Sequence, residues 1–257
     1  HTMNYRLMDV LERGPESPYY DYFDIDWDHH DPGLKGKVMV PFLGSELEDC
    51  LREEQIKLTF TAQGFKVNYF DTAYPLSLSA YSFLLSLMEK MNKDKTVNSI
   101  LQKMAGVAQG VNYETWLTSK LGYIEAIRQI PGQIQAVEEL LQSINQDRGL
   151  LGSILNQQYY RLTFWRETDN RINYRRFFTV NELICLRMED EKVFDEYHTY
   201  LFKLYKEKLI DGFRIDHIDG LQDPAKYIQA LRAELGDGCY IIAEKILEGK
   251  EDMPAQW

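Results

Sequence analysis

Two acidic residues near the end of the chain, Asp216 and Glu244, are spaced so that a pair of carboxyl groups could work together. Each acid ends a short run with strand character, 212–216 and 239–244, and the residues between the runs have the pattern of a helix. A strand–helix–strand unit of this kind places its strands parallel, with both carboxyl ends at one edge of a sheet. Two carboxyl groups facing one cleft are the minimum needed to break a glycosidic bond, so the spacing suggests this chemistry.

The neighbours of the two acids suggest different roles. Side chains alternate along a strand, so Arg214 shares a face with Asp216, and a guanidinium that close favours an ionised carboxylate suited to nucleophilic attack. Glu244 ends an apolar strand, where burial would favour the protonated form that a general acid needs. The same pattern is also typical of a structural ion pair, and the spacing alone leaves both interpretations open.

The elements that must hold these acids can be predicted from the flanking residues. Asp223 and Pro224 are typical of a helix start, with an N-cap acid before a proline at the first helical position. Apolar residues then recur at helical spacing, and Gly236 is placed to end the helix. The run that starts at Cys239 is nearly all apolar, as expected for a strand buried on both faces. Another helix, at about 193–209, is expected before the first strand.

The stretch GFRIDHIDGL, followed downstream by AEKIL, resembles the two central motifs of the α-amylase superfamily of retaining glycoside hydrolases and transglycosylases. The resemblance implies an α/β fold, a partial (β/α)8 TIM-type barrel with a helical insertion, in which Asp216 is the nucleophile and Glu244 the acid/base. It also implies substrate contacts from three neighbours, Arg214, His217 and Asp219. Lys and His would usually stand three and four places after the nucleophile, but here Asp219 and Gly220 occupy those places, so the chain departs from an ordinary amylase.

The DHIDGL variant resembles the branch of the superfamily that converts the reducing-end α-1,4 bond of maltooligosaccharides into an α,α-1,1 (trehalose) bond. Segments 18–44, 65–78 and 161–189 agree with this resemblance, although Thr179 replaces an expected acid. It implies an isomerase acting by intramolecular glycosyl transfer, with no cofactor and no metal. Two alternatives stay open: another α-glucan hydrolase or transferase of the superfamily, and a non-catalytic carbohydrate-binding module.

Two motifs of the superfamily, an earlier Asn-His pair and a later third catalytic carboxylate, are not found in this sequence. His1 and Thr2 before Met3 resemble the remainder of a cloning tag. We therefore expect a fragment of a longer enzyme, inactive in isolation. A partial barrel has open sheet edges, which predicts association between copies of the chain or exchange of an element.

The composition restricts the class of protein. The 257 residues include 29 Lys or Arg and 40 Asp or Glu, and the resulting net charge of −11 disfavours nucleic acid as a partner. No apolar run approaches the roughly 20 residues needed to cross a bilayer, so no membrane partner is expected. There is no secretion-signal pattern, and the three cysteines suggest reduced thiols. These features predict a cytoplasmic enzyme.

Two charged regions also suggest functions. The acid-rich run at 21–31, with His29 and His30, has oxygen ligands that suit calcium, but it lacks the spacing of a calcium-binding loop, so a solvated turn is expected. Arginines alternate with aromatic residues at 160–176. Because the whole chain is acidic, we expect these arginines to pair with carboxylates inside the fold or to contact sugar.

The chain divides into three predicted parts. Residues 1–77 form a loop-rich, barrel-associated segment with short strands, including a hairpin that turns at Gln63-Gly64. Residues 78–150 form a helical insertion, and residues 151–257 form part of the catalytic barrel. Insertions of this kind lie at the active-site end of barrel enzymes. Four helices are expected in the insertion, around the apolar positions of 84–88, 97–104, 116–127 and 134–144.

Overall fold

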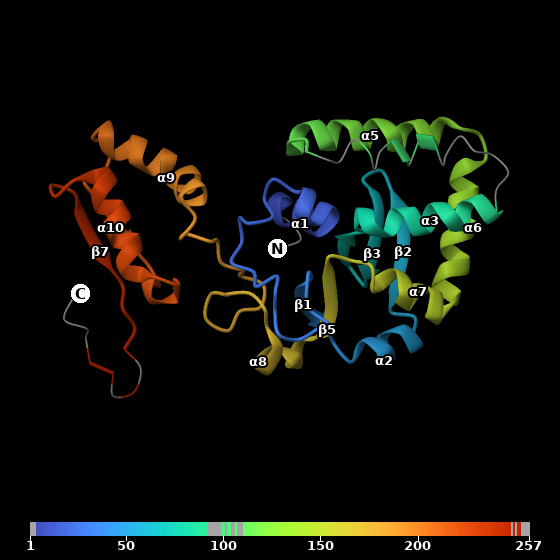
Figure 1. Cartoon of the computed structure of the whole chain (residues 1–257), viewed down its shortest axis with the longest axis horizontal. Helices are drawn as coiled ribbons and strands as arrows, with labels where there is room; N and C mark the ends of the chain where they lie inside the picture. The colour runs from blue at the N-terminus through green and yellow to red at the C-terminus, as the bar shows by residue number, and fades with distance from the viewer. Residues whose placement is uncertain are drawn as a thin grey trace. The chain divides into compact units, whose positions relative to one another are not determined.

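The computed structural model describes residues 4–91 and 110–247, together with 99–100, 102–103, 106, 249 and 251–252. The chain divides into two compact units, residues 1–175 and residues 176–257. Figure 1 shows the helices and strands of each unit and labels most of them. None of the helices in the described ranges is long and apolar enough to cross a membrane.

The first unit contains a parallel pair of strands and a small antiparallel sheet. The pair joins β1 (Val38–Leu43) to β5 (Tyr160–Phe164), and the antiparallel sheet has the order β2 (Ile56–Thr61), β3 (Gly64–Tyr69), β4 (Thr72–Pro75). The predicted hairpin is confirmed, because Thr61 pairs with Gly64 across the turn between β2 and β3. Gly64 has a φ of 103°, a conformation that glycine adopts without the steric penalty of a side chain.

Helices surround these strands (Figure 1). They are α1 (Tyr5–Arg13), α2 (Leu47–Arg52), α3 (Leu78–Met91), α5 (Tyr113–Gln129), α6 (Gln133–Gln146), α7 (Arg148–Leu155) and α8 (Thr168–Arg171), with 3-10 turns at Gly14–Glu16 and Trp165–Glu167. Three of the four helices predicted for residues 78–150 are confirmed as α3, α5 and α6. Half of the residues of the remaining one, predicted at 97–104, lie outside the described residues. Helix α6 packs against β2, and α5 packs against β3.

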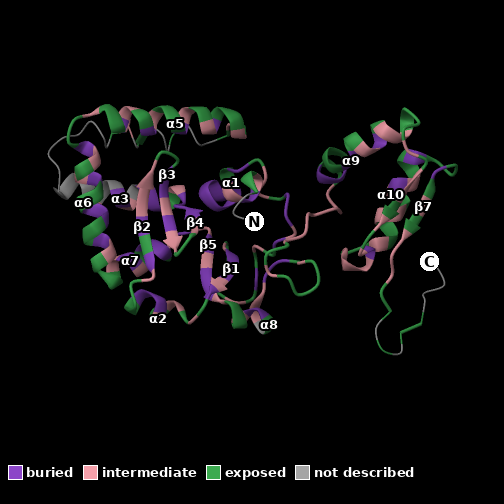
Figure 2. Cartoon of the chain, turned by 180° about the vertical axis from the view of Figure 1, so that it is seen from behind, coloured by how far each residue is buried: buried purple, intermediate pink, exposed green. Residues whose placement is uncertain are grey.

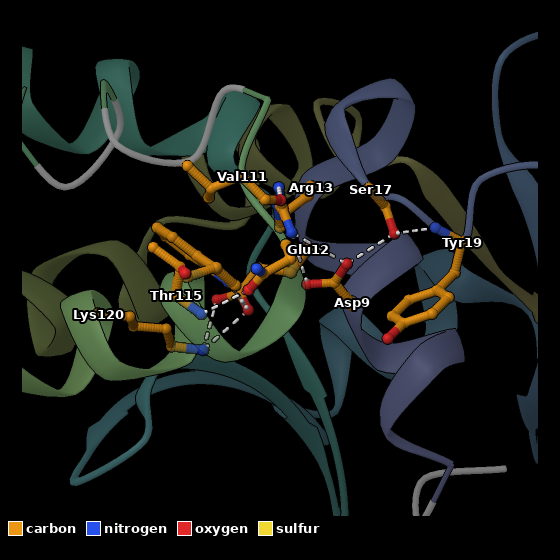
Figure 3. Close-up of polar contacts among 10 residues, drawn as sticks. Asp9, Glu12, Arg13, Ser17, Tyr19, Val111, Thr115 and Lys120 are labelled. Atoms are coloured by element: carbon orange, nitrogen blue, oxygen red, sulfur yellow. Dashed lines mark hydrogen bonds and ion pairs between the residues drawn. The ribbon is translucent and has the colours of Figure 1, made fainter.

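A network of buried charged residues joins α1 to the α5 segment in the first unit (Figure 3). Much of α1 is buried, as the purple parts of its ribbon show (Figure 2). Lys120 Nζ lies 2.7 and 2.8 Å from the two carboxylate oxygens of Glu12. Arg13 donates to the carbonyl of Val111 at 2.7 Å and pairs with Asp9 at 3.3 Å. Burial raises the pKa of Asp9, while its hydrogen bond from Ser17 Oγ (2.6 Å) and the nearby Arg13 act in the opposite direction. These contacts fix α5 against α1.

The second unit is the strand–helix–strand arrangement predicted from the sequence. Strand β6 (Gly212–Ile215) pairs in parallel with β7 (Tyr240–Ala243), and helix α10 (Pro224–Leu235) connects them. Helix α9 (Glu191–Lys206) precedes β6, and a 3-10 turn at Ile218–Gly220 follows it. The predicted helix start is confirmed, since Asp223 Oδ1 accepts a hydrogen bond of 2.9 Å from the Lys226 N–H. Gly236, with a φ of 74°, ends α10 as predicted.

One face of the β6–β7 pair packs against α9 and α10. Its residues, among them Phe213, Ile215 and Ile241, contact an apolar cluster formed by Phe194, Phe202, Leu231, Leu235 and Cys239. On the opposite face Tyr240 is 68% exposed and Ile242 is 46% exposed. The prediction that this strand is buried on both faces is therefore wrong for this structure. The reason is that, among the described residues, β7 pairs with β6 alone and the helices cover a single face.

The described residues thus form a mixed α/β fold with three small sheets, two of them parallel pairs. The two parallel pairs lie in different units, β1–β5 in the first and β6–β7 in the second. A closed or partial barrel is not confirmed by this arrangement.

Candidate active site

Asp216 and Glu244 directly follow the two parallel strands of the second unit, at their carboxyl ends. Ile215 lies opposite Ala243 in the register, and the Glu244 N–H donates to the Ile215 carbonyl at 2.8 Å. This bond extends the pairing by one residue beyond the strands. The structure therefore brings the two acids to the same edge of the sheet, as the sequence predicted.

Arg214 links the two acids. Its Nη2 atom lies 3.0 Å from Asp216 Oδ1 and 3.9 Å from Glu244 Oε1. Since both distances are measured from one atom, these two carboxylate oxygens are at most about 7 Å apart. A separation of at most about 7 Å is compatible with the roughly 5–5.5 Å between the carboxyl groups of retaining glycosidases. It overlaps only the lower end of the roughly 6.5–9.5 Å range of inverting glycosidases. The arrangement suits a nucleophile and a general acid acting on the same bond.

All three side chains are open to solvent. The exposed fractions are 66% for Arg214, 63% for Asp216 and 42% for Glu244. The burial that the sequence led us to expect for Glu244 is absent, because its side chain lies on the sheet face that the helices leave uncovered. At this exposure the ion pairs add little to stability, so the cluster is not explained as a stabilising salt bridge.

His217 follows Asp216 and turns the chain out of the strand direction. Its φ of 53° is uncommon for a residue other than glycine. The ring lies against Phe177 and Phe178, with centroids 4.6 and 4.0 Å away. It also covers Gly220, where a Cβ atom would lie 2.4 Å from His217 Nε2. The backbone N–H of His217 donates to Glu244 Oε2 at 3.3 Å, so this residue touches the second acid through its main chain.

Asp219 contacts the loop that follows β7. Its Oδ2 atom accepts from the Ile246 N–H at 3.3 Å and from Lys245 Nζ at 3.4 Å. Lys245 also donates to Glu251 at 3.0 Å, and these hydrogen bonds, that to Glu251 first, raise the pKa of the lysine. Asp219 and Lys245 are 20% and 11% exposed. Asp219 was predicted as a site residue from the sequence, but Lys245 and the two phenylalanines beside His217 were not. Lys245 lies in the AEKIL stretch and the phenylalanines lie in segment 161–189, so both stood in regions that carry the resemblance.

A cavity of about 750 Å³ in the second unit lies elsewhere. It is lined by α10 and the helix-facing side of β7, with Ile228, Ile241 and Ala243 among its residues. None of the predicted site residues lines it. This cavity is consequently not a pocket around Asp216 and Glu244.

The charged regions of the first unit form ion pairs. Arg171 pairs with Asp31 and, at 2.8 Å, with Glu167, and Arg175 pairs with Asp24 at 2.7 Å. The expected arginine–carboxylate pairing is confirmed for these two arginines, although their side chains are 38% and 40% exposed and so lie at the surface of the fold and not inside it. Over the described ranges, no group of three or more His, Cys, Asp or Glu side chains could hold a metal ion.

Known proteins resemble the chain over nearly its whole length. A putative maltooligosyl trehalose synthase, found in two strains of Mycobacterium tuberculosis, is 44% identical over 239 residues, which are 93% of this chain and 21% of that protein. The crystal structure of a maltooligosyl trehalose synthase has a TM-score of 0.59 at 28% identity, covering 98% of this chain and 24% of the other. The structure of maltooligosyltrehalose synthase from Arthrobacter ramosus has a TM-score of 0.57 at 27% identity, covering 98% of this chain and 23% of the other.

The chain is thus similar to one part of these enzymes and spans about a fifth of the length of the curated relatives it matches. This finding confirms the resemblance predicted from the GFRIDHIDGL and AEKIL motifs. No protein-family model matches the chain.

Proposed function

We propose that this chain is part of a maltooligosyl trehalose synthase, an isomerase, and that it supplies two of the groups that convert the reducing-end α-1,4 bond of a maltooligosaccharide into an α,α-1,1 bond. One observation carries the proposal. Asp216 and Glu244 follow neighbouring parallel strands at the same sheet edge, and one guanidinium, that of Arg214, contacts both. The similarity to enzymes of this name over 93% of the chain supports the choice of reaction.

In the proposed reaction Asp216 attacks the anomeric carbon of the penultimate glucose, while Glu244 protonates the leaving glycosidic oxygen. A covalent glycosyl-enzyme forms, and the terminal glucose is released within the site. That glucose rotates within the site, and its anomeric hydroxyl attacks the anomeric carbon of the glycosyl-enzyme while Glu244 acts as base. Two displacements retain the configuration and give the trehalose end. Substrate contacts from Arg214, His217 and Asp219 remain predictions, and the chemistry requires neither metal nor cofactor.

The sheet composition supports a partial (β/α)8 barrel as the parent fold. Arg214, Asp216 and Glu244 share their face with the exposed apolar residues Tyr240 and Ile242. In a barrel this face points inward, where side chains of other strands pack against it. We assign residues 1–77 to a barrel-associated segment, 78–150 to a helical insertion beside the substrate cleft and 151–257 to the barrel itself. Exclusion of water by the insertion would protect the glycosyl-enzyme from hydrolysis.

The chain alone leaves its acids open to water, so we expect it to be inactive by itself. The reaction is therefore tested in a chimera, in which this chain replaces the matching 239 residues of the Mycobacterium tuberculosis relative. Maltopentaose is the substrate, and carbohydrate chromatography identifies the products. A non-reducing product with a trehalose end is the expected result. Glucose and short maltosaccharides would instead indicate a hydrolase, and binding without turnover would indicate a carbohydrate-binding module.

Two substitutions assign the roles of the acids. Asp216→Asn and Glu244→Gln should each lower kcat of the chimera by at least about 100-fold, since each removes a group that acts in the transition state. Asp237→Asn, which removes an exposed acid of the same unit, is the matched control. With maltosyl fluoride, whose leaving group needs little protonation, the Glu244→Gln chimera should accumulate a maltosyl adduct that mass spectrometry locates on Asp216. An adduct on another residue, or activity that survives Asp216→Asn, would contradict the assignment.

We also propose that the isolated chain self-associates through its open strand edges and is a cytoplasmic protein, with nucleic acid and membranes excluded as partners. Static light scattering at rising concentration tests the association. A molar mass that stays at the 30.2 kDa of one chain would contradict it.

A further inference from the structure

The structure assigns Asp219 a positioning role: it holds Glu244, the proposed acid/base, through the loop after β7 and through the backbone of His217. This inference rests on the proposed function, because it names the group that orients its general acid. It also differs from the sugar contact that the sequence suggested for Asp219.

The carboxylate of Asp219 is occupied by protein groups. Oδ2 accepts from the Ile246 N–H and from Lys245 Nζ, as described above. Oδ1 is shielded from solvent and faces the imidazole Nδ1 of His217 at 3.6 Å. Since Oδ2 is hydrogen-bonded to the protein and Oδ1 is shielded from solvent, a bound sugar would have to compete with protein contacts to reach this side chain.

Hydrogen bonds hold the main chain on both sides of Glu244, and Asp219 supplies those on the C-terminal side. On the N-terminal side, the Glu244 N–H bonds to the Ile215 carbonyl and continues the pairing of β6 with β7. On the C-terminal side, Lys245 and Ile246 are tied to Asp219 within the next two residues. The main chain of Glu244 is therefore fixed at both ends, which is the arrangement expected for a catalytic side chain held in its productive orientation.

Asp219 also faces the residue that contacts the Glu244 carboxylate. The N–H of His217 donates to Glu244 Oε2, and it can do so because the φ of 53° turns the chain at this point. That unusual conformation is maintained by the packing of the ring against Phe177 and Phe178 and over Gly220. Asp219 closes the remaining side of the ring at Nδ1. The Asp219 carboxylate thus supports both the loop that follows Glu244 and, through the His217 ring, the backbone N–H that donates to the Glu244 carboxylate.

Hydrogen exchange of the isotope-labelled chain tests this arrangement without any activity assay. In Asp219→Ala, we expect the amides of His217 and Ile246 to exchange at least tenfold faster, while the amide of Ile242, inside β7, keeps its rate. Asp219→Asn retains an acceptor for the Ile246 N–H and should lie between the parent and Asp219→Ala. Asp237→Asn is the charge-matched control. Unchanged exchange at His217 and Ile246 in Asp219→Ala would overturn the proposal. If Asp219→Ala fails to fold, Asp219→Asn and Lys245→Met decide the same question.

Kinetics in the chimera separate positioning from sugar contact. A positioning role predicts a fall in kcat of about 10–100-fold with KM changed less than about threefold, because the loss affects the general acid and not ground-state binding. Asp219→Asn should recover part of kcat. A rise in KM at unchanged kcat would show instead that Asp219 contacts the sugar. If the parent chimera makes no trehalose product, the proposed function fails, while the exchange experiment still decides the role of Asp219 in the structure.

Discussion

Removing one partner of the buried Lys120–Glu12 pair should strongly destabilise the first unit. The substitution Lys120→Met takes away an ammonium 2.7 and 2.8 Å from the two Glu12 oxygens, at a place where the lysine and glutamate side chains are only 7% and 6% exposed. The carboxylate then stays buried without its counter-ion, and Trp116 Nε1, 3.4 Å away, is a weak replacement donor. Breaking a buried pair in this way costs about 3–5 kcal/mol. That is a large part of the roughly 5–15 kcal/mol by which a domain is stable.

Removing both partners should cost far less. Lys120→Met combined with Glu12→Leu eliminates the stranded charge, and apolar replacement of a buried ion pair is neutral or stabilising by about 1–4 kcal/mol in other proteins. Here the Trp116 N–H loses its acceptor, which costs about 1–3 kcal/mol. We therefore expect the unfolding free energy of the double variant to lie within about 2 kcal/mol of that of the parent chain and to exceed that of Lys120→Met.

Urea unfolding measures both effects, followed by far-UV circular dichroism and by tryptophan fluorescence, to which the buried Trp116 contributes. With a slope of about 2–3 kcal/mol per molar urea, the midpoint of the first unit should fall by about 1–2.5 M in Lys120→Met. Arg52→Met is the control, because the Arg52–Asp49 pair has side chains that are 58% and 39% exposed and is expected to contribute at most about 1 kcal/mol. If Lys120→Met lowers the unfolding free energy no more than Arg52→Met does, Glu12 is not a desolvated charge in the folded chain and the reasoning is refuted.

Three further predictions concern single side chains. Burial raises the pKa of Tyr227 from 10.0 to about 12, so its contribution to stability is complete below pH 10 and is lost as the pH rises towards 12; by pH 11 the loss is about 1.4 kcal/mol. Tyr227→Phe should remove this part of the fall in unfolding free energy between pH 9 and 11. If the unfolding free energies of the two proteins fall by the same amount over this pH range, the prediction is contradicted. Gly212→Ala places a Cβ 2.1 Å from the Tyr240 carbonyl oxygen and should push β6 away from β7. We expect the unfolding free energy to fall by about 1–3 kcal/mol and the Glu244 amide to exchange faster. Gly238→Ala is the control and should be tolerated, because a Cβ at this position meets no atom within 4 Å. Asn145→Ala removes two hydrogen bonds to the Leu58 backbone, of 2.8 and 3.0 Å, and should lower the unfolding free energy by about 1–3 kcal/mol relative to the exposed control Gln142→Ala; equal midpoints would count against it.

The parts of the fold that the sequence predicted correctly are those fixed by local chemistry. Asp223, Pro224 and Gly236 mark both ends of α10 by capping preferences that act within a few residues. The parallel order of β6 and β7 follows from the length of the connection between them. The proximity of Asp216 and Glu244 needed nothing beyond these two rules.

The features that were missed depend on distant contacts. Glu12 and Lys120 are 108 positions apart, and each alone resembles a solvent-facing residue of a surface helix. Nothing local indicates that the two would meet inside an apolar core. The turn at His217 is a second example, because strand alternation places its ring on the outer face, whereas the ring folds back onto Gly220 once the strand ends at Ile215. Its support by Phe177 and Phe178 involves residues about 40 positions earlier in the chain.

The wrong prediction for β7 has a different physical origin. The strand has the apolar composition of one buried on both faces, yet Tyr240 and Ile242 are exposed. Composition reflects the contacts for which a strand is suited, whereas exposure reflects the contacts present among the described residues. The difference falls on the face that bears Arg214, Asp216 and Glu244, so further protein is expected to cover the site as well as the two apolar side chains. If the barrel proposal is correct, the Tyr240 ring should be protected from oxidative hydroxyl-radical labelling in the chimera and open to it in the isolated chain. Equal labelling in the two proteins would mean that this face is a true surface and that the acids on it do not lie in a closed pocket.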